Sequence, residues 1–217
     1  MENSILIDKT IIFVKHKLQD AEGGHDWFHI ERVYRNAMLI AETETCNHLV
    51  VKLGALLHDI ADSKFHGGDE TIGPIIAKEF LSENNVDSEI IDHVVKIIQN
   101  ISFKGGNSPK AFHSIELDIV QDADRLDAIG AIGIARAFNY GGFKNRQLYN
   151  PEIKPSFGMD KEEYKKSASP TINHFYEKLL TLKDRMNTAT GKDLAFARHN
   201  YLQDFLKQFY NEWEGRK

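Results

Sequence analysis

The chain has 217 residues, 41% hydrophobic and 27% charged, which is an ordinary globular composition with room for one large domain or two small ones. The formal net charge of −5 argues against a dedicated nucleic-acid-binding protein, which needs a basic face for phosphates. Cys46 is the only cysteine, which excludes an internal disulfide and a cysteine-based zinc site and favours a cytoplasmic location.

Nothing in the sequence predicts a membrane partner. Acids and lysines interrupt the apolar residues of the N-terminal stretch "MENSILIDKTIIFVKHKL", which is atypical of a signal peptide. A membrane-spanning helix needs about 18 or more consecutive apolar residues, and the sequence has no such run.

Apolar residues recur mostly at helical spacing, and no alternating strand pattern of useful length occurs. We therefore predict an all-α fold with a single domain over residues 1–217. Its parts are a metal-site core over about residues 20–140, a long loop excursion over 141–170 and C-terminal helices over 171–217. The predicted helices span residues 5–18, 27–41, 48–61, 72–85, 87–102, 114–139, 171–186 and 192–213.

The helix predicted over residues 114–139 contains two glycines, Gly130 and Gly133. Inside a helix, each glycine costs up to about 1 kcal/mol relative to alanine. We interpret them as places where another helix approaches closely or where a site needs space.

The first cluster that could carry chemistry lies in "GALLHDIADSKF", residues 54–65, where an apolar run ends in His58 and Asp59. Asp62 follows one helical turn after His58 and shares its face. Burying an unpaired carboxylate costs several kcal/mol, so a partner has to offset that cost. A divalent ion is one such partner. The alternative is a helix C-terminus with a capping histidine and solvated acids.

The second cluster is "HDWFHIERVYRNA", in which His25 and His29 are four residues apart and Arg32 follows three residues later. His29 and Arg32 therefore share a helix face. A lone histidine on an amphipathic helix is usually structural. Here it comes with an arginine, whose planar, permanently charged head suits phosphate or carboxylate.

The third cluster is "VQDADRLDAIG", which places Asp122, Asp124 and Asp127 inside an apolar helical stripe. An EF-hand is excluded because Leu126 stands where an oxygen ligand is needed and no glutamate occupies the twelfth position. An intrahelical ion pair with Arg125 would explain one acid but not three. A metal ion shared by the three clusters would explain them all.

The order H…HD…D in these clusters resembles the HD-domain metal-dependent phosphohydrolases. His29 in "HDWFHIERV", His58 and Asp59 in "LLHDIAD" and Asp124 in "DADRLDAIGAIG" match the four metal ligands of that family. The fuller stretch "DADRLDAIGAIGIARAF", preceded by "SFKGG", resembles a small bacterial subgroup similar to nucleoside triphosphate pyrophosphohydrolases. The fold implied by this resemblance is all-α.

The resemblance implies a metal-dependent phosphohydrolase that cleaves a (deoxy)nucleoside triphosphate to the monophosphate and pyrophosphate. We expect Asp62 to orient or deprotonate the attacking water. Many related nucleotidases carry glutamate at this place, so the shorter aspartate is a departure. We expect Asp127 to hold a metal ligand or Lys64 in position without binding the ion itself. The residues expected to face the phosphates are Arg32, Lys64, Lys104 and Arg125.

One divalent ion is expected, Mn²⁺ by preference, with Mg²⁺, Co²⁺, Fe²⁺ and Ni²⁺ as alternatives. One other function is a sensor that binds a nucleotide without turnover. Another is a phosphodiesterase or phosphatase of the same fold, with two ions in some members, for which His93 and His113 could supply ligands. Core packing is the preferred account of His93, given its neighbours in "IIDHVVKII". The sequence is compatible with a homodimer.

Overall fold

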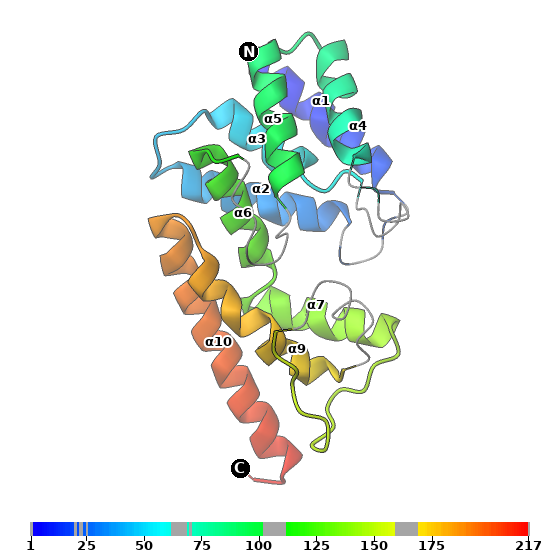
Figure 1. Ribbon diagram of the computed structural model, residues 1–217, viewed down its shortest axis with the longest axis vertical. Helices are drawn as coiled ribbons and strands as arrows, with labels where there is room; N and C mark the ends of the chain where they lie inside the picture. Colours follow the sequence, from blue (N-terminus) through cyan, green and yellow to red (C-terminus); the bar gives the residue numbers. More distant parts are fainter. Residues whose placement is uncertain are drawn as a thin grey trace. The chain divides into compact units, whose positions relative to one another are not determined.

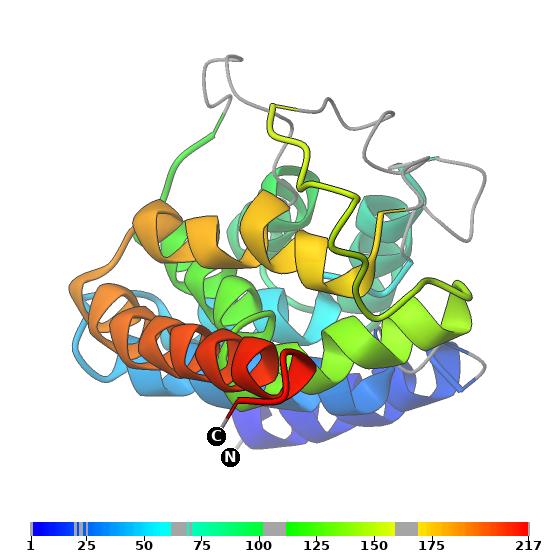
Figure 2. The same ribbon diagram turned by 90° about the horizontal axis from the view of Figure 1, so that it is seen from below.

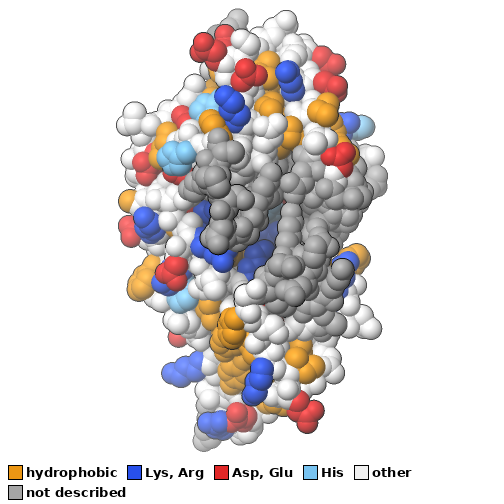
Figure 3. Space-filling model, viewed as in Figure 1, with side chains coloured by type: hydrophobic (Ala, Val, Ile, Leu, Met, Phe, Trp, Pro, Cys, Tyr) orange, Lys and Arg blue, Asp and Glu red, His pale blue; other side chains and the backbone are white. Residues whose placement is uncertain are grey.

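The computed structural model describes residues 2–19, 21, 24, 26–61, 69, 71–101, 112–158 and 169–216. Every regular element in these ranges is a helix, which confirms the predicted all-α class (Figure 1). None of the described helices combines the length and the apolar character that a membrane span requires. On the face seen in Figure 3, acidic and basic side chains are interspersed with hydrophobic ones over the described surface.

The chain divides into two compact units, residues 1–124 and 125–217, and the boundary falls near the end of helix α6. The prediction of a single domain stays a prediction. The first unit contains α1 (Glu2–Lys17), α2 (Trp27–Ala41), α3 (His48–Leu57), α4 (Ile72–Glu83), α5 (Ser88–Asn100) and most of α6 (Ile115–Asp127). The second unit contains α7 (Gly130–Phe143), α9 (Thr171–Glu177), the 3₁₀ helix η2 (Leu179–Arg185) and α10 (Ala189–Trp213).

Helix α3 forms the centre of the first unit, where α1, α2 and α5 pack against it and α4 packs on α5. All but one of its residues from Val50 to Leu57 are buried. α3 ends at Leu57, four residues before the predicted end at residue 61. The next residues form a turn in which the Ile60 N–H donates to the Leu57 carbonyl at 3.3 Å. This early end places His58 at the C-cap of α3.

The single helix predicted over residues 114–139 was wrong, because the chain breaks between α6 and α7. Gly130 has a φ of +74°, in the left-handed region that disfavours residues with a Cβ atom. A Cβ atom on Gly133 would lie 2.3 Å from the Ala128 carbonyl oxygen. The two glycines therefore serve the turn between two helices, and the close approach at Gly133 is to the chain's own backbone.

In the second unit, α10 lies alongside α7 and η2, and α9 packs on η2 and α7 (Figure 2). The helix predicted over residues 171–186 is divided into α9 and η2. The division falls at Lys178, whose φ of −139° is outside the helical range. The other described helices begin and end within about three residues of the predicted ends, within the usual uncertainty of helix boundaries.

Candidate metal centre

The buried imidazole of His58 sits at the end of α3 with its two ring nitrogens in different surroundings. Nδ1 lies 2.9 Å from the Ala55 carbonyl oxygen. Because a carbonyl only accepts, Nδ1 is the donor of this bond, and in the neutral ring Nε2 is the nitrogen with the lone pair. Among the described residues Nε2 has no hydrogen-bond partner although it is buried. Leaving such an atom unsatisfied costs about 1–3 kcal/mol, which a metal ion at Nε2 would offset.

His29 comes from the first turn of α2 and is also buried. Asp26 caps this helix, and its side chain accepts from the His29 N–H at 3.0 Å. The cap holds the backbone that carries the imidazole. The His29 and His58 rings meet edge to face, with centroids 5.4 Å apart and planes at 68°.

His29, His58 and Asp59, which we call the metal group, bring one possible ligand atom each within 4.8 Å of one another. Nitrogen and oxygen ligands bind a first-row divalent ion at about 2.1 Å, so ligands on opposite sides of one ion are about 4.2 Å apart. The spread of the metal group is close to that span. It is the only group of three such residues found in the described part of the chain.

Asp124 faces the metal group from α6. Its Oδ1 lies 3.6 Å from the His29 Nε2 and 3.9 Å from the His58 Nε2. Both distances are too long for hydrogen bonds, but they suit two ligands of a common ion. The Asp124 side chain is 40% exposed, whereas both histidines are buried, so Asp124 lies on the open side of the site.

Two amides fix α6 next to the site. Asn36 lies on α2 two turns after His29, and its Nδ2 donates to the Ala123 carbonyl at 3.4 Å. Gln121 Nε2 donates to the carbonyl of Asn100, at the end of α5, at 2.8 Å. These bonds fix α6 at the residues one and three positions before Asp124. Sequence reasoning missed both, because each joins segments far apart in the chain.

The predicted residues outside the metal group have different placements. Arg32 is half-buried on α2, one turn after His29. Arg125 Nη1 donates to the Arg185 carbonyl at 2.7 Å within the second unit. Asp127 is buried and accepts from Arg136 Nη1 at 2.5 Å. Their predicted roles stay predictions. Other predicted residues lie outside the described part of the chain: His25, Asp62, Lys64 and Lys104.

His93 and His113 are not members of the metal group. His93 Nε2 lies 2.9 Å from Ser114 Oγ and 3.4 Å from a carboxylate oxygen of Glu116. His113 Nε2 lies 2.8 Å from Asp118 Oδ2. Both histidines therefore contact the first turn of α6 or the residue before it. The preferred account of His93 as pure core packing was incomplete, because its ring is hydrogen-bonded to Ser114.

The HD domain model matches residues 27–129, a range that contains His29, His58, Asp59 and Asp124. YpgQ of Bacillus subtilis is 39% identical over 206 residues, which cover 94% of this chain and 91% of YpgQ. The chain belongs to the HD superfamily. The resemblance drawn from the three clusters is thereby confirmed, and HD domains bind divalent metal ions.

Solved structures agree over almost the whole chain. An HD-superfamily hydrolase from Bacillus thuringiensis is 43% identical, with a TM-score of 0.79, and the match covers 99% of this chain and 100% of that one. A protein from Lactobacillus plantarum is 37% identical, with a TM-score of 0.80 and coverage of 96% and 97%. The Bacillus subtilis YpgQ structure in complex with ADP is 34% identical, with a TM-score of 0.77 and coverage of 98% and 97%.

Proposed function

We propose that this HD protein is a metal-dependent phosphohydrolase that cleaves a (deoxy)nucleoside triphosphate to the monophosphate and pyrophosphate. The observation that carries the proposal is the buried Nε2 of His58, which has no hydrogen-bond partner among the described residues. His58 also brings one possible ligand atom within 4.8 Å of ligand atoms of His29 and Asp59. The hydrolase from Bacillus thuringiensis supports the reaction class. The ADP complex of YpgQ supports a nucleotide as the ligand.

His29, His58, Asp59 and Asp124 would hold one divalent ion. When bound, such an ion polarises a phosphoryl oxygen and makes water more acidic. A mixed histidine and aspartate set suits Mn²⁺, Fe²⁺, Co²⁺ or Mg²⁺ better than ions that prefer thiolate ligands. We propose Mn²⁺ as the resident ion. The proton on Nδ1 of His58, held by the Ala55 carbonyl, keeps the other nitrogen available as a ligand.

The remaining residues would orient the substrate and move the proton. Asp62 would accept the proton of the attacking water, three residues after Asp59. Arg32, which follows His29 by one turn of α2, is our first candidate to bind a phosphate of a nucleotide at the metal group. Arg125 already donates to the Arg185 carbonyl and is the weaker candidate. Lys64 and Lys104 would complete the phosphate contacts.

The proposal is tested by product analysis on a panel of ribo- and deoxyribonucleoside triphosphates, ADP and simple phosphodiesters. Turnover should stop after chelation and return with Mn²⁺, and triphosphates should yield monophosphate and pyrophosphate. Hydrolysis in ¹⁸O-labelled water identifies the phosphorus attacked, because the label enters the monophosphate after attack at the α-phosphorus. His113→Ala is a suitable control, since His113 lies outside the metal group.

Three results would point elsewhere. Release of inorganic phosphate alone would indicate a phosphatase, and cleavage restricted to diesters would indicate a phosphodiesterase. Nucleotide binding without metal-dependent turnover on any member of the panel would indicate a sensor. Each of these outcomes rejects the pyrophosphohydrolase proposal while leaving the metal group to be judged by its own binding assay.

A further inference from the structure

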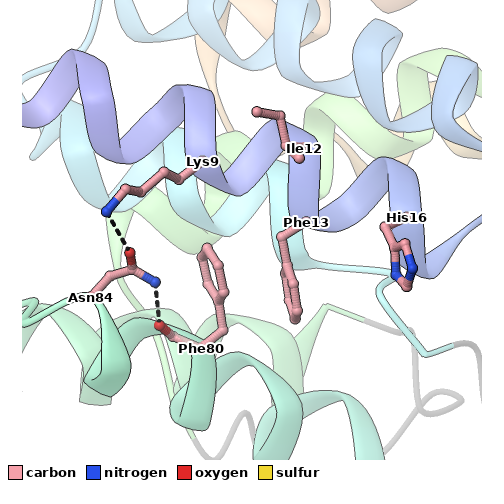
Figure 4. Close-up of a pocket in the computed structure, with 6 residues that line it drawn as sticks. All are labelled: Lys9, Ile12, Phe13, His16, Phe80 and Asn84. Carbon is pink, nitrogen blue, oxygen red and sulfur yellow. Dashed lines mark hydrogen bonds between the residues drawn. The ribbon is translucent and has the colours of Figure 1, made fainter.

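An open pocket lies in the first unit, on a side formed by α1 and α4, and shares no residue with the metal group (Figure 4). Its volume is about 400 Å³, within the range of roughly 300–1,000 Å³ typical of small-molecule pockets. Four of its lining residues come from α1, and two come from α4 or its C-cap. They are Lys9, Ile12, Phe13, His16, Phe80 and Asn84.

The middle of this pocket is apolar. The rings of Phe13 and Phe80 stack 4.1 Å apart at an angle of 11°. Ile12, beside them, is 68% exposed, which leaves a branched aliphatic side chain in water next to two phenyl rings. An aliphatic chain lying over these groups would remove apolar surface from water on both partners, the main source of binding free energy for such ligands.

The ends of the pocket are polar and basic. Figure 4 shows the Lys9–Asn84 pair at one end, His16 at the other, and the two phenyl rings between them. Lys9 Nζ donates to Asn84 Oδ1 at 3.2 Å, and Asn84 Nδ2 donates to the Phe80 carbonyl at 2.9 Å. The second bond fixes the amide that orients the ammonium group. An ammonium has three N–H donors, so Lys9 can bind an anion while keeping its bond to Asn84.

The charged side chain among those that line the pocket is that of a lysine. None of the six lining side chains is acidic, and Lys17 Nζ lies 5.6 Å from the centre of the Phe13 ring. Asp8, the acid that precedes Lys9, lies near Tyr34 of α2, where its charge helps to raise the pKa of the phenol after the larger effect of burial. An anionic group at the Lys9 end would therefore meet the Lys9 ammonium, and the apolar row would accept the rest of the ligand.

We propose that this α1–α4 pocket binds an elongated amphipathic monoanion of the medium-chain fatty carboxylate class. The carboxylate would pair with Lys9, and the chain would lie along Phe80, Phe13 and Ile12 towards His16. A nucleotide fits less well, because the amide of Asn84 is engaged by Lys9 and by the backbone and the apolar row offers no hydrogen bonds to a base edge. The assignment is independent of the proposed phosphohydrolase activity.

The test is calorimetric titration of the full chain with decanoate below its micelle concentration, with decan-1-ol as the uncharged ligand of equal chain length. One saturable site per chain is expected, and decanol should bind about tenfold or more weakly, because it lacks the charge-assisted hydrogen bond. Lys9→Gln removes the charge, and Ile12→Asn removes the aliphatic wall. Each should weaken decanoate binding by about tenfold or more.

Matched controls are Lys207→Gln on α10 and Leu39→Asn on α2, which change exposed side chains that do not line the pocket. Both should bind within about twofold of the original chain. Lys9 and Ile12 are exposed, so unchanged circular dichroism is expected for all four variants. Non-saturating heats, equal affinity for decanol, or decanoate affinities of Lys9→Gln and Ile12→Asn that match the controls would overturn the proposal.

Discussion

Replacing Asp127 by asparagine removes the carboxylate that faces Arg136 and changes the side-chain volume very little. The Asp127 side chain is 2% exposed, and its Oδ2 lies 2.5 Å from Arg136 Nη1. A second guanidinium, that of Arg198, is close enough for the Asp127 charge to act on its pKa. Burial, the larger effect, lowers that pKa, and Asp127 opposes the lowering. Arg198 also donates to the Leu126 carbonyl at 2.6 Å.

Breaking a buried ion pair by removing one partner costs about 3–5 kcal/mol, because the other charge is left unpaired. The Arg136 side chain is 21% exposed and keeps some contact with water, which places the expected loss near the lower end, at about 3 kcal/mol. For a chain of this length, each kcal/mol lowers the melting temperature by about 2–4 °C, so a fall of about 6–12 °C is expected.

The assay is urea denaturation together with thermal melting of Asp127→Asn, Arg136→Gln and the double variant. The double variant should lose less unfolding free energy than the sum of the two single losses, and the difference, the coupling energy, should be about 1–3 kcal/mol. Asp204→Asn, on the exposed side of α10, is the control and should stay within about 0.5 kcal/mol. An Asp127→Asn protein as stable as this control would refute the reasoning. A fall in Mn²⁺ affinity in the same variant would support the predicted role of Asp127 in holding a metal ligand in position.

Three further predictions concern single positions. Asp62→Asn should keep its metal and its fold while kcat falls by about 10²- to 10⁴-fold with little change in KM. Asp62→Glu should retain activity. Near-normal turnover of metal-loaded Asp62→Asn would show that Asp62 has no part in the mechanism. Burial, with smaller effects of Lys178 and Arg146, lowers the pKa of His174 to about 3. The unfolded chain then binds the extra proton between about pH 6.5 and 3, so stability should fall by up to about 1.4 kcal/mol per pH unit on acidification, and His174→Gln should flatten this slope in melts at several pH values. Gly133→Ala should destabilise by about 1–3 kcal/mol, because its Cβ would lie 2.3 Å from the Ala128 oxygen; an unchanged denaturation midpoint would contradict that packing.

The sequence predicted the all-α class because apolar spacing is a local property that survives in the structure. The helix breaks were harder to predict. Gly130 is recognisable in the sequence, but a glycine inside a helical pattern can indicate either close packing of another helix or a turn. Its φ of +74° in the structure shows that it forms a turn. The change from α9 to the 3₁₀ helix η2 falls at Lys178 in a stretch without glycine or proline, so packing within the second unit rather than local propensity accounts for it.

The candidate site also has a part that was predictable from the sequence and a part that was not. Its side chains were predictable because histidines and aspartates interrupt apolar helices at unusual places. Their supports were not predictable. Asn36 contacts Ala123 across 87 residues, and Gln121 reaches the Asn100 carbonyl across 21 residues. The bond from His58 Nδ1 to the Ala55 carbonyl is made at the C-cap of α3, which ends at Leu57, four residues before the predicted end.

The central claim is that the metal group and Asp124 bind one divalent ion. The most direct test is an equilibrium titration with Mn²⁺, in which the free ion is measured by electron paramagnetic resonance. The account predicts one ion per chain, and a loss of at least about 100-fold in affinity for His58→Ala and for Asp59→Ala. His113→Ala and Asp92→Ala, which change residues outside the metal group, should bind like the original chain. Full Mn²⁺ occupancy at unchanged affinity in both His58→Ala and Asp59→Ala would contradict the account.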